Sequence, residues 1–162
     1  MKKGFTLVET LIAVTITATI GVVIVSTFLA GQSYYSHEKE RVRNEAEAME
    51  AITRMEKAIR IANNFVIYDN KTEMNPVTSG GTYLELLDVK GTLGDSSDDE
   101  TIEFWLSGDT CYYQSSLYGT KQLAKNFNSL TFSEDNLLVE INFQIEVPRG
   151  VINYSTSAML RN

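Results

Sequence analysis

Glu9 is the residue of this sequence whose type and position most strongly suggest chemistry. It is the only charged residue from Gly4 to Ser36, and the basic residues Lys2 and Lys3 precede it. An ionised carboxylate costs about 2.5 kcal/mol or more toward the centre of a bilayer unless it is paired. The sequence therefore predicts that the Glu9 carboxylate has a partner.

An uncharged run of 27 residues, Thr10–Ser36, follows Glu9. About 20 apolar residues suffice for a helix to cross the hydrocarbon core, so the run predicts a membrane span. Lys2 and Lys3 place the amino terminus in the cytoplasm and the rest of the chain outside the cytoplasmic membrane. The alternative is a cleavable secretory signal, but its apolar core would be shorter, and 30–32 fits a cleavage site only loosely.

The segment Lys3-Gly4-Phe5-Thr6-Leu7-Val8-Glu9 resembles the processing site of type IV pilins and type II secretion pseudopilins. The basic leader, the Gly-Phe junction, the Thr-Leu-Val-Glu sequence and the long apolar run occur together and in order. This resemblance implies that a membrane aspartic protease, the prepilin peptidase, cleaves after Gly4. It further implies that the new amino-terminal Phe5 is N-methylated and that Glu9 pairs with the terminal amine of a neighbouring subunit.

The resemblance also implies a non-enzymatic role as a filament subunit of a type IV pilus, a competence system or a type II secretion system. Its partners would be other pilin or pseudopilin subunits, the membrane assembly platform and, before assembly, the lipid bilayer. Segments 52–60 and 158–162 resemble those of minor pilins and minor pseudopilins. The sequence departs from many major pilins because its span has no proline and its carboxyl-terminal region has no cysteine pair.

Four carboxylates lie within six residues: Asp95, Asp98, Asp99 and Glu100. Oxygen ligands on a flexible loop can hold Ca²⁺, and some pseudopilins use calcium. The spacing does not match an EF-hand loop, and an acidic, solvated turn is the more ordinary interpretation. We therefore predict no cofactor, with calcium at this loop as the open alternative.

The sequence contains few residues that could act in catalysis. His37 is the only histidine and lies just after the span, where a nucleophile–histidine pair or a zinc site is hard to build. Cys111 is the only cysteine, so it cannot form an internal disulfide. A buried thiol is the more common state of such a residue, and a surface thiol that joins two chains is the alternative. We predict that the protein is not an enzyme.

The length and charge of the chain limit its organisation and its partners. The 162 residues leave room for one membrane helix and one head of about 100 residues. The net charge of −7 argues against direct binding of nucleic acid, because phosphate contacts rely on Lys and Arg. Carbohydrate, protein and cation partners stay open.

We predict an α+β fold in which one long helix packs on an antiparallel β-sheet head. Residues 1–4 form the leader, 5–36 the span or filament-core helix, 37–65 its amphipathic continuation and 66–162 the head. From Val42 to Ala62 apolar residues recur every three or four positions, which is the helical period. The balanced charges of this segment are typical of a solvated helix face.

Alternating apolar residues and turn residues predict the strands of the head. The predicted strands cover 82–89, 101–106, 111–115, 130–133, 137–147 and 151–160. Turns are expected at 108–109, at 134–136 and at 148–150. The order of these strands in the sheet stays open.

Two functions from different classes fit this organisation. The first is the filament subunit. The second is a monomeric extracellular binding module that the span anchors in the membrane. The two functions differ at Gly4 and Glu9, because a simple anchor has no use for an isolated carboxylate in its apolar run.

Overall fold

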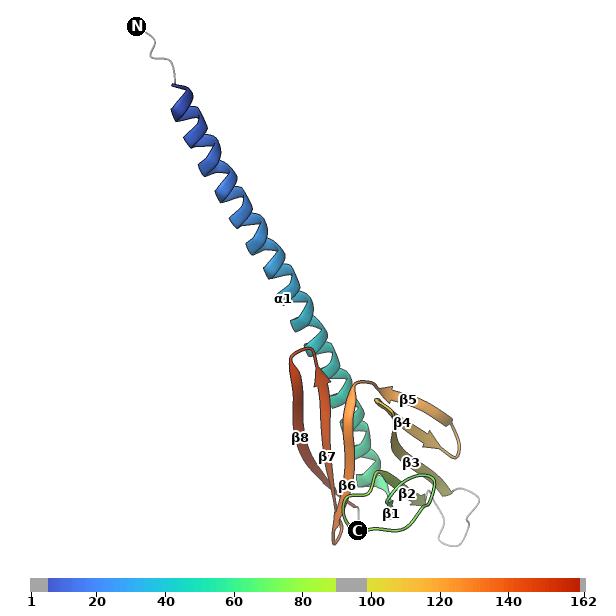
Figure 1. Ribbon diagram of the computed structural model, residues 1–162. Helices are drawn as coiled ribbons and strands as arrows, with labels where there is room; N and C mark the ends of the chain where they lie inside the picture. Colours follow the sequence, from blue (N-terminus) through green and yellow to red (C-terminus); the bar gives the residue numbers. More distant parts are fainter. Residues whose placement is uncertain (1–5, 90–98, 161–162) are drawn as a thin grey trace. The chain divides into compact units, whose positions relative to one another are not determined.

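The computed structural model describes residues 6–89 and 99–160 (Figure 1). One helix, α1, runs from Leu7 to Ile61, and the strands follow it along the chain. The chain divides into two compact units, Met1–Lys39 and Glu40–Asn162. The long helix and the antiparallel sheets on which it packs confirm the predicted α+β class.

The second half of α1 is amphipathic, as its sequence period predicts. Its buried side chains recur at steps of three or four: Asn44, Ala48, Ala51, Ile52, Met55, Ala58 and Ile59. Three ion pairs at i,i+4 spacing lie on its solvated side: Arg41–Glu45, Arg43–Glu47 and Glu50–Arg54. Each such pair contributes only a few tenths of a kcal/mol. Burial of the apolar stripe therefore holds this part of the helix on the sheets.

Five antiparallel strands form the first sheet, in the order β1-β2-β3-β4-β5. Their bounds are β1 Asn64–Tyr68, β2 Tyr83–Val89, β3 Asp99–Ser107, β4 Thr110–Ser115 and β5 Gly119–Ala124. The Asn63 N–H donates to the Leu87 carbonyl oxygen at 2.9 Å, so the end of α1 leads directly into this sheet.

Three antiparallel strands form the second sheet, in the order β6-β7-β8. Their bounds are β6 Phe127–Asp135, β7 Leu138–Val147 and β8 Gly150–Met159. A two-residue bridge joins the sheets: the Gly81 N–H donates to the Phe132 carbonyl at 3.1 Å, and the Phe132 N–H donates back at 2.7 Å. A Cβ on Gly81 would clash with the Ile67 side chain and the Tyr68 carbonyl oxygen. Only glycine allows this approach without a shift of its neighbours.

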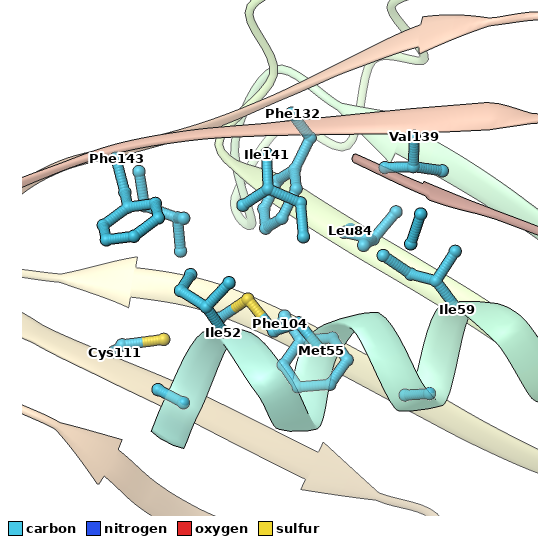
Figure 2. Packing of buried hydrophobic residues seen from close by; sticks show 14 of the residues in the cluster. Ile52, Met55, Ile59, Leu84, Phe104, Cys111, Phe132, Val139, Ile141 and Phe143 are labelled. Carbon is cyan, nitrogen blue, oxygen red and sulfur yellow. The ribbon is translucent and has the colours of Figure 1, made fainter. Parts of the chain in front are cut away.

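The core of the head contains side chains from α1 and from both sheets. Ile52, Met55 and Ile59 of α1 belong to the same buried cluster as Leu84 and Phe104 of the first sheet. Figure 2 shows these side chains together with Phe132, Val139, Ile141 and Phe143 of the second sheet. Burying a side chain of this size stabilises the fold by about 1.5–3 kcal/mol.

The structure differs from the predicted strands at three points. β1 and β5 were not predicted, and the head contains two sheets where one was expected. The turn between β6 and β7 is at Asn136–Leu137, because β6 stays paired with β7 through Asp135↔Leu138. Asn136 has a φ of 57°, a conformation that asparagine tolerates better than most residues.

Candidate assembly site

The start of α1 forms a reciprocal cap between Thr6 and Glu9. The Thr6 N–H and the Thr6 hydroxyl donate to Glu9 Oε2 at 2.9 and 3.0 Å. The Glu9 N–H donates to Thr6 Oγ1 at 3.3 Å. This arrangement is a capping box, in which a hydroxyl residue and a glutamate three positions later satisfy each other's free N–H groups. Thr6 was not predicted as a site residue, although its Thr-x-x-Glu spacing is the usual signal.

Oε1 of Glu9 accepts no hydrogen bond within the described ranges 6–89 and 99–160. A carboxylate can accept about four hydrogen bonds, so capacity is left for a donor from outside the chain. Capping the helix and binding a second group are therefore compatible roles for Glu9.

The helix surface that follows Glu9 is apolar and exposed on every side. Val22 is 69% exposed and Val14 is 63% exposed, and none of the described residues from Thr6 to Ser36 is buried. The helix contains an 18-residue window of mean hydropathy 2.3, which by length and composition is enough to cross a membrane. A contiguous apolar surface of this kind marks a site of contact with lipid or protein.

Five threonine and serine hydroxyl groups of this surface bond within the helix. Thr15 Oγ1 donates to the Leu11 carbonyl at 2.8 Å, and Thr19 Oγ1 donates to the Thr15 carbonyl at 2.9 Å. Thr17, Ser26 and Thr27 donate in the same way to carbonyls three or four residues earlier. These side chains can enter an apolar environment without leaving a donor unsatisfied. Glu9 is the one group in this part of α1 whose charge requires a partner.

Gly21 and Gly31 leave two positions of the same surface without a side chain. Nothing lies within 4 Å of a Cβ built on either residue, and α1 continues through both. Glycines of this kind allow two helices to approach closely, and the sequence also leaves local melting during assembly open.

Other predicted site residues lie partly outside the described residues. Gly4, Phe5, Asp95 and Asp98 are outside them, and the side chain of Asp99 is not described. Glu100 is 3% exposed, and its Oε1 accepts a hydrogen bond from Ser115 Oγ at 2.5 Å. Among the residues that the structure describes, no three His, Cys, Asp or Glu side chains form a group that could hold a metal ion. The calcium alternative at 95–100 stays an untested prediction.

Neither a known family model nor a curated protein matches this sequence. Its functional interpretation therefore rests on the residues and on their geometry.

The head contains a cavity of about 360 Å³ between α1, β3, β4 and β5. Its lining residues are Arg54, Lys57, Ala58, Ile61, Glu100, Ile102, Phe104, Tyr113, Tyr118, Lys121 and Leu123. Neither His37 nor Cys111 is among them. Cys111 is fully buried in β4, and burial raises the pKa of its thiol to about 12. A thiol in this state is a poor nucleophile at neutral pH.

Proposed function

We propose that this chain is a structural subunit, a minor one, of a type IV pilus or a related pseudopilus. It is made as a prepilin, cleaved after Gly4 and assembled through α1. The observation that carries the proposal is Glu9: one carboxylate, capped by Thr6, whose Oε1 accepts no hydrogen bond from the described residues, at the start of a helix surface that is otherwise apolar and exposed.

Cleavage after Gly4 would place a new amine close to this carboxylate. The α-amino group of Phe5 has a reference pKa near 8, so it is largely cationic at neutral pH. In a bundle of staggered helices, Glu9 of an incoming subunit meets the amine of a subunit already docked. Misregister leaves both charges unpaired in an apolar environment, at a cost of several kcal/mol. The pair thereby sets the axial stagger of the helices more than it adds net stability.

The uncharged surface of α1 fits the two environments of such a subunit. Before assembly it contacts lipid, with the amino terminus in the cytoplasm and the head outside the cytoplasmic membrane. After assembly it contacts the helices of other subunits, and the head lies on the outside of the filament at the cell surface. Prepilin peptidase and the membrane assembly platform are the partners between these two states.

Three variants separate the charge of Glu9 from its capping role. Glu9→Gln keeps a residue that can complete the capping box but removes the charge. Thr6→Ala removes the cap and keeps the charge, and Glu9→Leu removes both. We expect all three to insert into the membrane and to be cleaved. Glu9→Gln and Glu9→Leu should enter sheared filaments at least about tenfold less than wild type, whereas Thr6→Ala should enter nearly normally.

An immunoblot against the head measures incorporation as the amount of each variant in the filament fraction relative to the membrane fraction. Wild-type incorporation of Glu9→Gln together with a defect in Thr6→Ala would limit Glu9 to capping, and helix packing alone would then direct assembly.

The second candidate function is a monomeric, membrane-anchored binding module, and the 360 Å³ cavity in the head favours it. A cavity of this size is in the range of small-molecule sites. Under this alternative the leader stays on the chain, and none of the three variants changes the location of the protein.

A further inference from the structure

β8 is an edge strand that lacks the usual protection against pairing with another chain. Among the described residues, β8 pairs only with β7, over ten residues with no bulge. Gly150–Met159 contains no charged residue and no proline. A long, regular and uncharged edge presents a row of unpaired N–H and C=O groups, which is a template for a further strand.

The other three sheet edges in the described part of the chain are protected. β1 has five residues, and the Val77 N–H covers it by donating to the Ile67 carbonyl at 2.8 Å. The bridge to Gly81 covers β6, and the Glu134 N–H bonds there to the Thr78 carbonyl. β5 has six residues and carries Lys121, and a register shift interrupts its pairing with β4. Short length, covering segments, bulges and lysine are the common devices that block an edge.

The register of the hairpin shows which backbone groups of β8 are free. Val147 pairs with Gly150 across a two-residue turn, so these two residues exchange both hydrogen bonds. The pattern alternates along the strand and agrees with the Leu160 N–H, which donates to the Leu137 carbonyl at 3.0 Å. The even-numbered residues of β8 therefore bond to β7. The odd-numbered residues direct their N–H and C=O groups away from it: Val151, Asn153, Ser155, Ser157 and Met159.

The side chains around this edge indicate which kind of strand could pair with β8. Such a strand would be apolar on one face and would carry small polar side chains on the other. Thr156 Oγ1 donates to Glu56 Oε1 at 2.6 Å, which places β8 beside the flank of α1 that carries Glu56. Met49 lies seven residues earlier on the same flank and is 43% exposed. A strand added to β8 would cover Met49 with its inner side chains. Its outer side chains would lie beside Asn153, Ser155 and Ser157.

We propose that β8 accepts an extended strand from a different polypeptide, uncharged and alternating between apolar and small polar side chains. The choice of a different chain rests on the proposed function. Copies of one subunit in a filament share one orientation, so their β8 edges all point the same way around the axis. Two identical edges pair only across a two-fold axis, which such a filament lacks. The partner strand therefore comes from another protein of the assembly.

A synthetic peptide provides a probe with the required alternation. It has the sequence (Val-Ser)5, which differs from that of β8, behind two added lysines and a fluorescein, and fluorescence anisotropy reports its binding to the full chain in detergent micelles. Ser155→Pro removes an N–H that faces away from β7, so the β7–β8 ladder stays complete. Ser155→Ala keeps that N–H and is the matched control. We expect Ser155→Pro to bind the peptide at least tenfold more weakly than Ser155→Ala.

Hydrogen exchange on the wild-type chain tests the same contact without a substitution. Bound peptide should slow exchange at the odd-numbered amides of β8 and leave exchange at the even-numbered amides unchanged. Equal binding to both variants, binding by a peptide of scrambled order, or no protection at the odd-numbered amides would overturn the proposal. So would a wild-type chain that dimerises in sedimentation and becomes monomeric on Ser155→Pro, because the occupant would then be a second copy. Peptide binding does not depend on filament entry, so failure here leaves the test of Glu9 intact.

Discussion

The Glu9 carboxylate caps its own helix, and in the proposed filament it would also bind the amine of a neighbouring subunit. Thr6 donates twice to Oε2, and Oε1 accepts nothing within the described residues. An amine from a neighbouring subunit can therefore approach without breaking the cap. A preformed cap also fixes the rotamer of Glu9, which lowers the entropy lost when the pair forms.

Cys111 should be inert in the folded protein. Burial raises the pKa of its thiol to about 12, so at pH 8 its thiolate fraction is about a thousandfold smaller than that of an ordinary cysteine. We expect iodoacetamide to leave Cys111 unlabelled in the native chain and to label it once denaturant is added, as intact mass can show. Complete labelling within minutes under native conditions would place the thiol at the surface.

Asp69 should make the stability of the head depend on acid pH. The Asn75 side-chain amide donates to Oδ2 at 3.1 Å, and the Asn70 and Asn75 N–H groups donate to Oδ1 at 2.6 and 3.1 Å. These bonds, the Asn75 side chain first, lower the pKa of Asp69. A lowered pKa contributes stability that is present above the unfolded value near 4 and is lost as pH falls through the folded value.

The comparison of wild type with Asp69→Asn isolates this contribution. The difference between their thermal midpoints should be largest near pH 7 and should shrink below about pH 4. A difference that stays constant from pH 7 to pH 2 would mean that ionisation of Asp69 does not affect folding.

At the scale of the elements, the strands found from sequence are those with clear alternation and a clear turn. β3 and β4 were predicted because Ile102, Phe104 and Leu106 alternate and Gly108–Asp109 follows. β1 was missed because Phe65, Val66 and Ile67 do not alternate and only two residues, Ala62 and Asn63, separate this strand from α1. β5 was missed because Gly119–Ala124 has few apolar residues, and its pairing with β4 defines it. The Gly81–Phe132 bridge between the two sheets joins residues 51 positions apart, so it leaves no local signal in the sequence.

Gly81→Ala should destabilise the head through that bridge. The added Cβ would clash with the Ile67 side chain and the Tyr68 carbonyl oxygen, and overpacking of this kind costs about 1–3 kcal/mol. We expect the thermal midpoint to fall by roughly 5–15 °C. Ser79→Ala, at an exposed position two residues earlier, is the control and should melt like wild type. A Gly81→Ala midpoint within about 1 °C of wild type would show that the bridge tolerates a side chain.

At the scale of the whole molecule, the chain combines a head that has its own core with a helix segment whose side chains are all exposed. The core of Glu40–Asn162 contains side chains from α1 and both sheets. The surface from Thr6 to Ser36 is exposed and mainly apolar, and threonine and serine hydroxyl groups such as those of Thr15 and Thr19 bond within the helix. Sequence alone predicted this apolar helix and Glu9 within it, because both depend on composition along a single element. The capping partner Thr6 was overlooked although its Thr-x-x-Glu spacing is a sequence signal, whereas the open edge of β8 required the spatial arrangement.

The most direct test of a filament role is the amino terminus of the protein isolated from its native membrane or filament. A subunit that assembles by pairing Glu9 with a terminal amine must lose residues 1–4, because only cleavage creates that amine at Phe5. Top-down mass spectrometry should therefore find a chain that begins at N-methylated Phe5, and the Gly4→Leu variant should retain residues 1–4 and stay in the membrane. A wild-type chain that keeps Met1, or that begins after Ala30, would contradict the account.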